Sequence, residues 1–206
     1  PTPETPETEP VVPADLVPAS VEETSTPVPT ADDGYTEWTS DSSLPTSGTY
    51  RLTQDVTIST ASSKYPTVTG TLVLDLAGHT ITVSGDGYYA YFVNNSKASL
   101  TIQDSGSSGK ITNDGVNASS KTLIQVNGGC FSLEGGTLEN TTSNGYALFL
   151  NSDSTAEISG GTVVNTASNG YAVQVNSKAE LTLSDGTIKN TVDGGQALYL
   201  NSSSSL

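Results

Sequence analysis

The sequence predicts an all-β fold, a single-stranded parallel β-helix in which each turn of the chain forms one rung of about 25 residues. The first observation is a repeat: GYALFLN from Gly145, GYAVQVN from Gly170 and GQALYLN from Gly195 follow one another at a fixed spacing. The second is that apolar and polar residues alternate in three short runs per repeat, separated by Asn, Ser, Asp and Gly. The third is that no stretch carries the apolar spacing of an amphipathic helix.

The apolar positions predict the inward-facing columns of the solenoid. Ile124 and Val126 precede Leu148 and Leu150 by 24 residues, so the same two positions face the core in successive rungs. Further upstream, residues 90–114 and 71–83 fit the same pattern with insertions. We therefore expect roughly five rungs. At the usual distance between neighbouring strands, these rungs give a solenoid about 25 Å long.

Asparagines recur at two positions of each rung. Asn tolerates the left-handed backbone of a tight corner, and its amide can bond to the amide of the next rung. Because these residues follow the rung period, we predict that they form structural ladders and not ligand sites. The first predicted ladder is Asn127, Asn151, Asn176 and Asn201, and the second is Asn113, Asn140, Asn165 and Asn190.

The N-terminal part of the chain differs in composition. Eight of the ten prolines lie in residues 1–30, so residues 1–34 are predicted to be an acidic Pro/Thr/Glu-rich tail or linker. Its apolar residues Val11, Val12, Leu16 and Val17 are candidates for docking on another surface. Residues 35–69 are predicted to be N-terminal cap strands, with Trp38 and Leu44 covering the open end of the core.

Residues 70–206 are predicted to be the β-helix itself. The final residues NSSSSL match NSKAEL of the preceding repeat and stop in the middle of a rung. We therefore expect either that the chain continues beyond Leu206 or that the open end stacks on another subunit.

Several motifs resemble a known family. They are WTSDSSLPTSGTYRLTQDVTIS from Trp38, LVLDLAGHTITV from Leu72, and the later GGTLEN, GGTVVN and DGTIKN. This pattern resembles the secreted or cell-surface right-handed parallel β-helix proteins of Gram-positive gut bacteria, in the pectin-lyase-like superfamily. The resemblance implies a right-handed solenoid and an extracellular location, and it extends from about Trp38 to the end of the chain.

Charge and chemistry narrow the function classes. The net charge is −15, which disfavours nucleic acid and anionic membranes as partners. No apolar run approaches the ~18–20 residues needed to cross a bilayer. The acidic residues do not align as a catalytic pair, and no metal-binding or nucleophile motif occurs, so we expect no enzyme activity, no cofactor and no metal within residues 1–206.

One predicted outward column suits binding. It contains Tyr91, Gln125, Phe149, Gln174 and Tyr199, and it combines rings with amides as glycan-binding surfaces do. An alternative is that a neighbouring segment, such as the tail, covers these residues. Tyr146 and Tyr171 are expected at a corner, packing against the ladder.

These observations favour a non-catalytic extracellular stalk or adhesin that binds a glycan or a host or cell-surface protein. Two alternatives stay open. One is a self-assembling fibre, a homo-polymer formed through the open ends and the tail. The other is a fragment of a polysaccharide-active enzyme whose catalytic rungs lie beyond Leu206.

Overall fold

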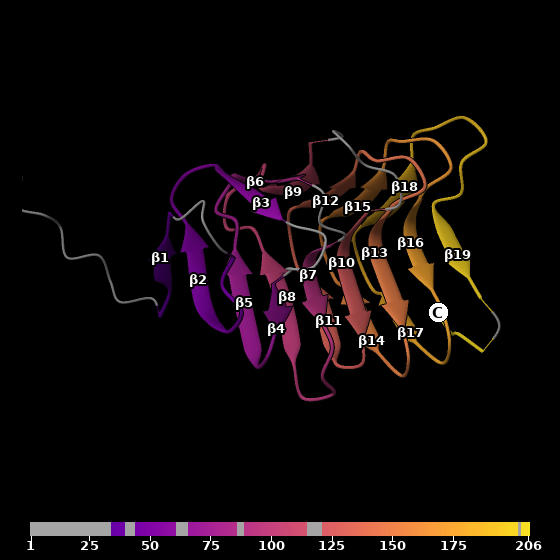
Figure 1. The fold of residues 1–206 in the computed structure, drawn as a ribbon, viewed down its shortest axis with the longest axis horizontal. Helices are drawn as coiled ribbons and strands as arrows, with labels where there is room; N and C mark the ends of the chain where they lie inside the picture. Colours follow the sequence, from indigo (N-terminus) through magenta and orange to yellow (C-terminus); the bar gives the residue numbers. More distant parts are fainter. Residues whose placement is uncertain (1–33, 40–43, 61–65, 86–88, 115–120, 202) are drawn as a thin grey trace, which may run out of the picture. The chain divides into compact units, whose positions relative to one another are not determined.

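The computed structural model describes residues 34–39, 44–60, 66–85, 89–114, 121–201 and 203–206. Over these residues it contains β-strands and no helix, and the strands form three parallel sheets. The chain passes from the first sheet to the second and then to the third, and this path repeats about six times (Figure 1). The predicted parallel β-helix is therefore confirmed, with about one rung more than expected.

The sheets are named here by their order along the chain. The first sheet contains β1 (Thr36–Trp38), β2 (Gly48–Leu52), β5 (Thr71–Asp75), β8 (Ser99–Gln103), β11 (Cys130–Leu133), β14 (Thr155–Ile158) and β17 (Glu180–Leu183). The second contains β3 (Val56–Thr60), β6 (Thr80–Gly85), β9 (Lys110–Asn113), β12 (Thr137–Asn140), β15 (Thr162–Asn165) and β18 (Thr187–Asn190). The third contains β4 (Thr67–Val68), β7 (Tyr89–Val93), β10 (Thr122–Asn127), β13 (Tyr146–Asn151), β16 (Tyr171–Val175) and β19 (Leu198–Leu200).

The core lies between the three sheets and is filled by the inward columns. In the third sheet Ile124 pairs with Leu148, and Leu148 pairs with Val173, so each apolar side chain stacks on its equivalent in the next rung. All three are buried, as are most of the apolar residues that face the core from the other two sheets. Because one rung alone could not enclose these side chains, the stacking of rungs supplies most of the apolar burial.

The predicted cap strands do not form a separate element. β2, β3 and β4 pair in parallel with β5, β6 and β7, so these three strands form the first complete rung. The boundary predicted at residue 70 therefore has no counterpart in the sheets. β1 adds one more strand beyond β2, and Trp38 and Leu44 are buried in the same core.

The tail and its predicted docking residues Val11, Val12, Leu16 and Val17 lie outside the described residues, which begin at Gly34. At the other end, the last rung leaves core positions open. Leu183 is 44% exposed and Leu200 is 42% exposed, although each pairs with a buried residue of the rung before. Ser205 bridges to Glu180 and begins the next strand position in the first sheet.

The second asparagine series forms a buried hydrogen-bonded stack at the end of the second sheet. The Asn113 amide donates to the Asn140 oxygen at 3.2 Å, and the Asn140 amide donates to the Asn165 oxygen at 2.6 Å. Asn190, in the last rung, instead donates to the carbonyls of Gly170 and Gln196. The bonds join neighbouring rungs at one corner and satisfy polar groups that water does not reach.

The left-handed backbone expected of these asparagines occurs elsewhere. Asn144 and Asn169 have φ values of 58° and 56°, in the turns that follow the ladder residues Asn140 and Asn165. Asn is suited to this conformation because its short polar side chain lowers the cost of positive φ. In these two rungs the ladder residue and the turn residue are thus different asparagines.

The first asparagine series lies on the more exposed side of the third sheet. The Asn127 amide donates to Asn94, and the Asn151 amide donates to Asn127, both at 3.0 Å. Asn176 instead accepts a bond from Gln174, and Asn201 is exposed in the last rung. This ladder extends to Asn94, which the predicted series did not include.

Candidate functional site

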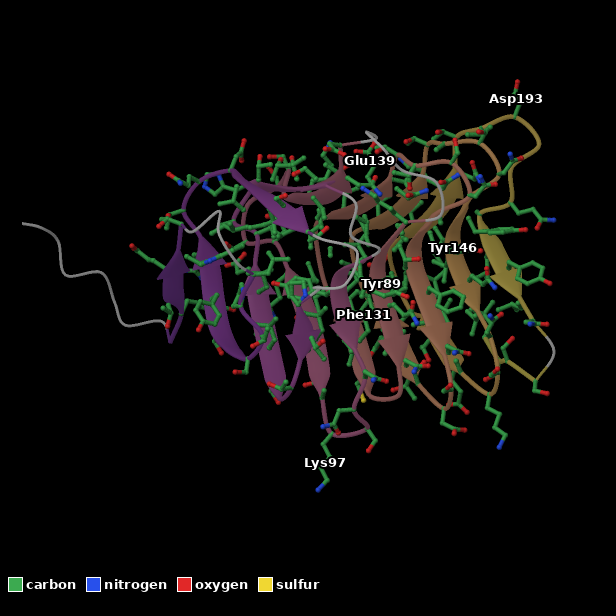
Figure 2. The ribbon with its side chains drawn as sticks, in the orientation of Figure 1. Tyr89, Lys97, Phe131, Glu139, Tyr146 and Asp193 are labelled. Atoms are coloured by element: carbon green, nitrogen blue, oxygen red, sulfur yellow. The ribbon has the colours of Figure 1, made fainter. Side chains whose placement is uncertain are left out.

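The outer side of the third sheet carries two columns of aromatic and polar side chains. In the first column Thr122 pairs with both Tyr89 and Tyr146, and Tyr146 pairs with Tyr171. Figure 2 shows Tyr89 and Tyr146 along this same sheet. The second column consists of Gln125, Phe149, Gln174 and Tyr199, which pair in that order. Together these eight residues are called the aromatic face: Tyr89, Thr122, Gln125, Tyr146, Phe149, Tyr171, Gln174 and Tyr199.

Four rings of the aromatic face form a continuous series. The Tyr146 and Tyr171 rings are nearly parallel, with an interplanar angle of 5° and centroids 5.9 Å apart. Phe149 lies 5.4 Å from Tyr146, and Tyr199 lies 5.3 Å from Tyr171. These spacings fall in the range of favourable ring contacts, so the rings hold one another in place across three rungs.

Each of these rings keeps part of its surface exposed. Tyr146, Phe149 and Tyr171 are half-buried, and Tyr199 is 38% exposed. Burial first, and the neighbouring Tyr171 second, raise the pKa of the Tyr146 hydroxyl. The hydroxyl is therefore neutral at physiological pH and can both donate and accept a hydrogen bond.

The surface between the two columns is hollowed. An open hollow of about 280 Å³ is lined by Tyr89, Thr122, Gln125, Tyr146, Phe149, Gln174 and Asn176. The Gln174 amide donates to the Asn176 side-chain oxygen at 3.0 Å, which fixes the orientation of both groups. A second hollow of about 500 Å³ lies at the adjoining corner, and Tyr171, Asp193 and Gln196 are among the residues that line it.

The sequence placed four of the five predicted column residues on this face and misplaced one. Tyr91 pairs with Ile124, an inward residue, and it is 0% exposed. The prediction that Tyr91 faces outward is therefore wrong, and Phe92 is the residue that pairs with Gln125. Burial raises the pKa of Tyr91, and its hydroxyl has no hydrogen-bond partner among the described residues.

Tyr146 and Tyr171, which were expected at a corner, are the first residues of β13 and β16. Strict alternation would place Tyr146 on the inward side with Leu148 and Leu150. In the structure Ala147 and Leu148 are both buried, so two consecutive residues face inward and Tyr146 lies outside. β13 begins at a corner of the rung, and the alternation of inward and outward side chains starts only after that corner.

The outer side of the first sheet offers a contrasting surface. It has a hollow of about 380 Å³ lined mainly by hydroxyl groups, with Cys130 and the carboxylates of Glu157 and Glu180. Glu157 pairs with Ser132 and Thr182, so no second carboxylate follows it in its own column. This surface has no outward aromatic ring among its lining residues.

Groups that bind metal ions do not gather in the described parts of the chain. No cluster of three or more His, Cys, Asp and Glu side chains could hold a metal ion there. Within the same residues, no helix is long and apolar enough to cross a membrane. Comparisons of this chain with protein-family models, with curated proteins and with solved structures find no match.

Proposed function

We propose that this protein is a non-catalytic extracellular surface protein whose β-helix binds a glycan on the aromatic face. The observation that carries the proposal is the series of half-buried rings Phe149, Tyr146, Tyr171 and Tyr199, flanked by the amides of Gln125 and Gln174. Aromatic rings pack on the apolar faces of sugars, and amides bond to sugar hydroxyls. Rings that already hold one another in place lose little entropy on binding.

The composition of the same face supports binding without turnover. The third-sheet strands β7, β10, β13, β16 and β19 contain no Asp, Glu, His, Lys or Arg. Glycoside hydrolysis uses two carboxyl groups roughly 5–9.5 Å apart, and this face provides neither of them. A sugar bound there would contact groups that recognise it but no carboxyl, imidazole or amine that transfers a proton.

A polysaccharide panel in affinity gel electrophoresis would test the proposal on the full chain. At least one polysaccharide is expected to retard the protein, and Tyr171→Ala is expected to weaken binding about tenfold, because this ring contacts two others. Thr182→Ala, on the outer side of the first sheet, is the control and should bind like the parent protein.

Two outcomes would contradict the proposal. One is that no polysaccharide retards the protein, which is also what a covering segment over the aromatic face would produce. The other is that the bound polysaccharide gains reducing ends or unsaturated products during incubation, which would identify an enzyme.

The alternative of a self-assembling fibre has its own support. Leu183 is 44% exposed and Leu200 is 42% exposed, and strands with unpaired edges are templates for further pairing. If copies stack through the end of the β-helix that carries these leucines, light scattering will show a mass that rises with concentration, and Leu183→Lys will abolish the rise. Thr182→Lys, which adds the same charge on the same strand, should leave it unchanged. A constant monomer mass at all concentrations would exclude this form of assembly.

A further inference from the structure

The aromatic face lacks charge along its whole described length. Its strands contain no ionisable side chain apart from tyrosine. Lys97 and Lys178 lie in the turns after β7 and β16, and Lys97 extends away from the sheet (Figure 2). Lys121, just before β10, is buried, and its Nζ donates to the Gly85 carbonyl. An anionic sugar would find no cation here and would be repelled by a chain of net charge −15.

The face also repeats along the axis of the β-helix. Its strands pair in parallel and in register, so equivalent side chains recur at the interstrand distance of about 4.8 Å. The ring centroids of Tyr146 and Tyr171, neighbours in the first column, are 5.9 Å apart, and Tyr199 of the second column lies on the next strand, 5.3 Å from Tyr171. In an extended β-linked polysaccharide each sugar advances the chain by a similar length. An α-linked glucan curls and would leave a flat face after one or two sugars.

The hollow on this face is longer than one sugar. Its lining residues come from four neighbouring strands, from Tyr89 on β7 through Thr122 on β10 and Tyr146 on β13 to Gln174 on β16. Tyr171, which stacks on Tyr146, lines the second hollow at the adjoining corner. A ligand that filled the hollow of the aromatic face alone would therefore cross four rungs.

From the proposed glycan binding and these three features, we infer the class of the ligand. It is an extended, uncharged, β-linked polysaccharide that runs along the axis of the β-helix, with about one sugar on each rung. The rings contact the sugar faces, and Gln125, Gln174 and Asn176 bond to the hydroxyl groups between them.

Isothermal titration calorimetry of the full chain with β-1,4-linked gluco-oligosaccharides of two to six sugars tests this inference. The association constant is expected to rise about three- to tenfold for each sugar added up to about four, and then to level off. It should be insensitive to salt, because no ion pair forms. Maltohexaose and hexagalacturonate should each bind at least about tenfold more weakly than the β-linked hexamer.

A substitution in the ring series distinguishes ligand contacts that repeat on successive rungs from binding at a single position. Tyr146→Ala removes a ring from the middle of the series and should flatten the rise with length, while Thr182→Ala should keep it. The inference is overturned if affinity does not depend on length, or if the α-linked or uronate hexamer binds as well as the β-linked one. In either case binding of a glycan to this face would still stand. If no glycan of any class binds, the proposed function fails together with the inference.

Discussion

Replacing Asn140 with alanine is expected to lower the free energy of unfolding by about 3–5 kcal/mol, since several buried polar groups would lose their partners at once. The Asn140 amide donates to Asn165 at 2.6 Å and to the Thr142 carbonyl at 2.9 Å. Its oxygen accepts from Asn113 at 3.2 Å and from the Thr142 hydroxyl at 2.8 Å. Asn140 is fully buried, so water cannot replace these bonds. Urea unfolding followed by circular dichroism would measure the loss.

Asn151→Ala is the matched control, because it removes the same side chain from the other ladder. The Asn151 amide donates to Asn127 at 3.0 Å, but both residues are partly exposed. Water can take over the lost bond, so the expected loss is about 1 kcal/mol or less. Equal losses for the two variants would mean that burial does not set the importance of the ladder.

The contrast between the ladders illustrates what the sequence can and cannot predict. A fixed repeat identifies which residues share a column, because rungs of equal length must stack in register. The repeat does not show how deeply a column is buried, because burial depends on whether the side chains at that corner face the core or the solvent. The sequence predicts both series as structural ladders, and the structure shows that Asn113, Asn140 and Asn165 of the second series are buried, whereas the first series is not.

The same reasoning explains the outcome for the candidate site. Gln125, Phe149, Gln174 and Tyr199 could be aligned because the later rungs keep nearly constant length. Between β7 and β10 the rung is longer: Asn94 and its ladder partner Asn127 are 33 residues apart. Because of the extra residues, the sequence does not show which residues of β7 and β10 pair. The sequence pattern therefore predicts Tyr91 in the outward column.

The first rung resembles a cap in the sequence for a related reason. Its third strand, β4, has only two residues, Thr67 and Val68, and the sequence before it shows no repeat. Short alternating runs such as β2 and β3 look alike in a cap and in a rung. Only the pairing of β2, β3 and β4 with β5, β6 and β7 distinguishes them, and this information is not local in the sequence.

Asp75 is the second residue whose loss should have a large effect, and its side chain is only 2% exposed. Its carboxylate accepts from Arg51 Nε at 2.8 Å and from the backbone N–H groups of Ala77 at 3.0 Å and Ser105 at 2.8 Å. Asp75→Ala is expected to lower the free energy of unfolding by about 3 kcal/mol at neutral pH, because a partly buried ion pair and two backbone bonds are lost. Thermal or urea unfolding of the two proteins would measure this difference.

The effect of Asp75 should also depend on pH. Burial raises the pKa of this carboxyl, but the hydrogen bonds from Ser105, Arg51 and Ala77 together outweigh burial and hold the pKa below its ordinary value. A group whose pKa is lower in the folded state stabilises the fold above its unfolded pKa and loses that contribution as pH falls through the folded pKa. The difference between parent and variant should therefore stay constant down to about pH 4 and shrink below it.

Asp55→Ala is the control for Asp75→Ala, because Asp55 is an aspartate at the surface of the protein. The Asp55 side chain is 74% exposed. It accepts a bond from the Thr80 N–H at 2.8 Å and lies 3.4 Å from His79 Nδ1, and because water can replace both partners its loss should cost less than about 1 kcal/mol. If the stability difference caused by Asp75→Ala grew on acidification, the carboxyl would have to be protonated in the folded protein. Burial would then dominate over the hydrogen bonds, and the ion pair with Arg51 would not be what ties the first two rungs together.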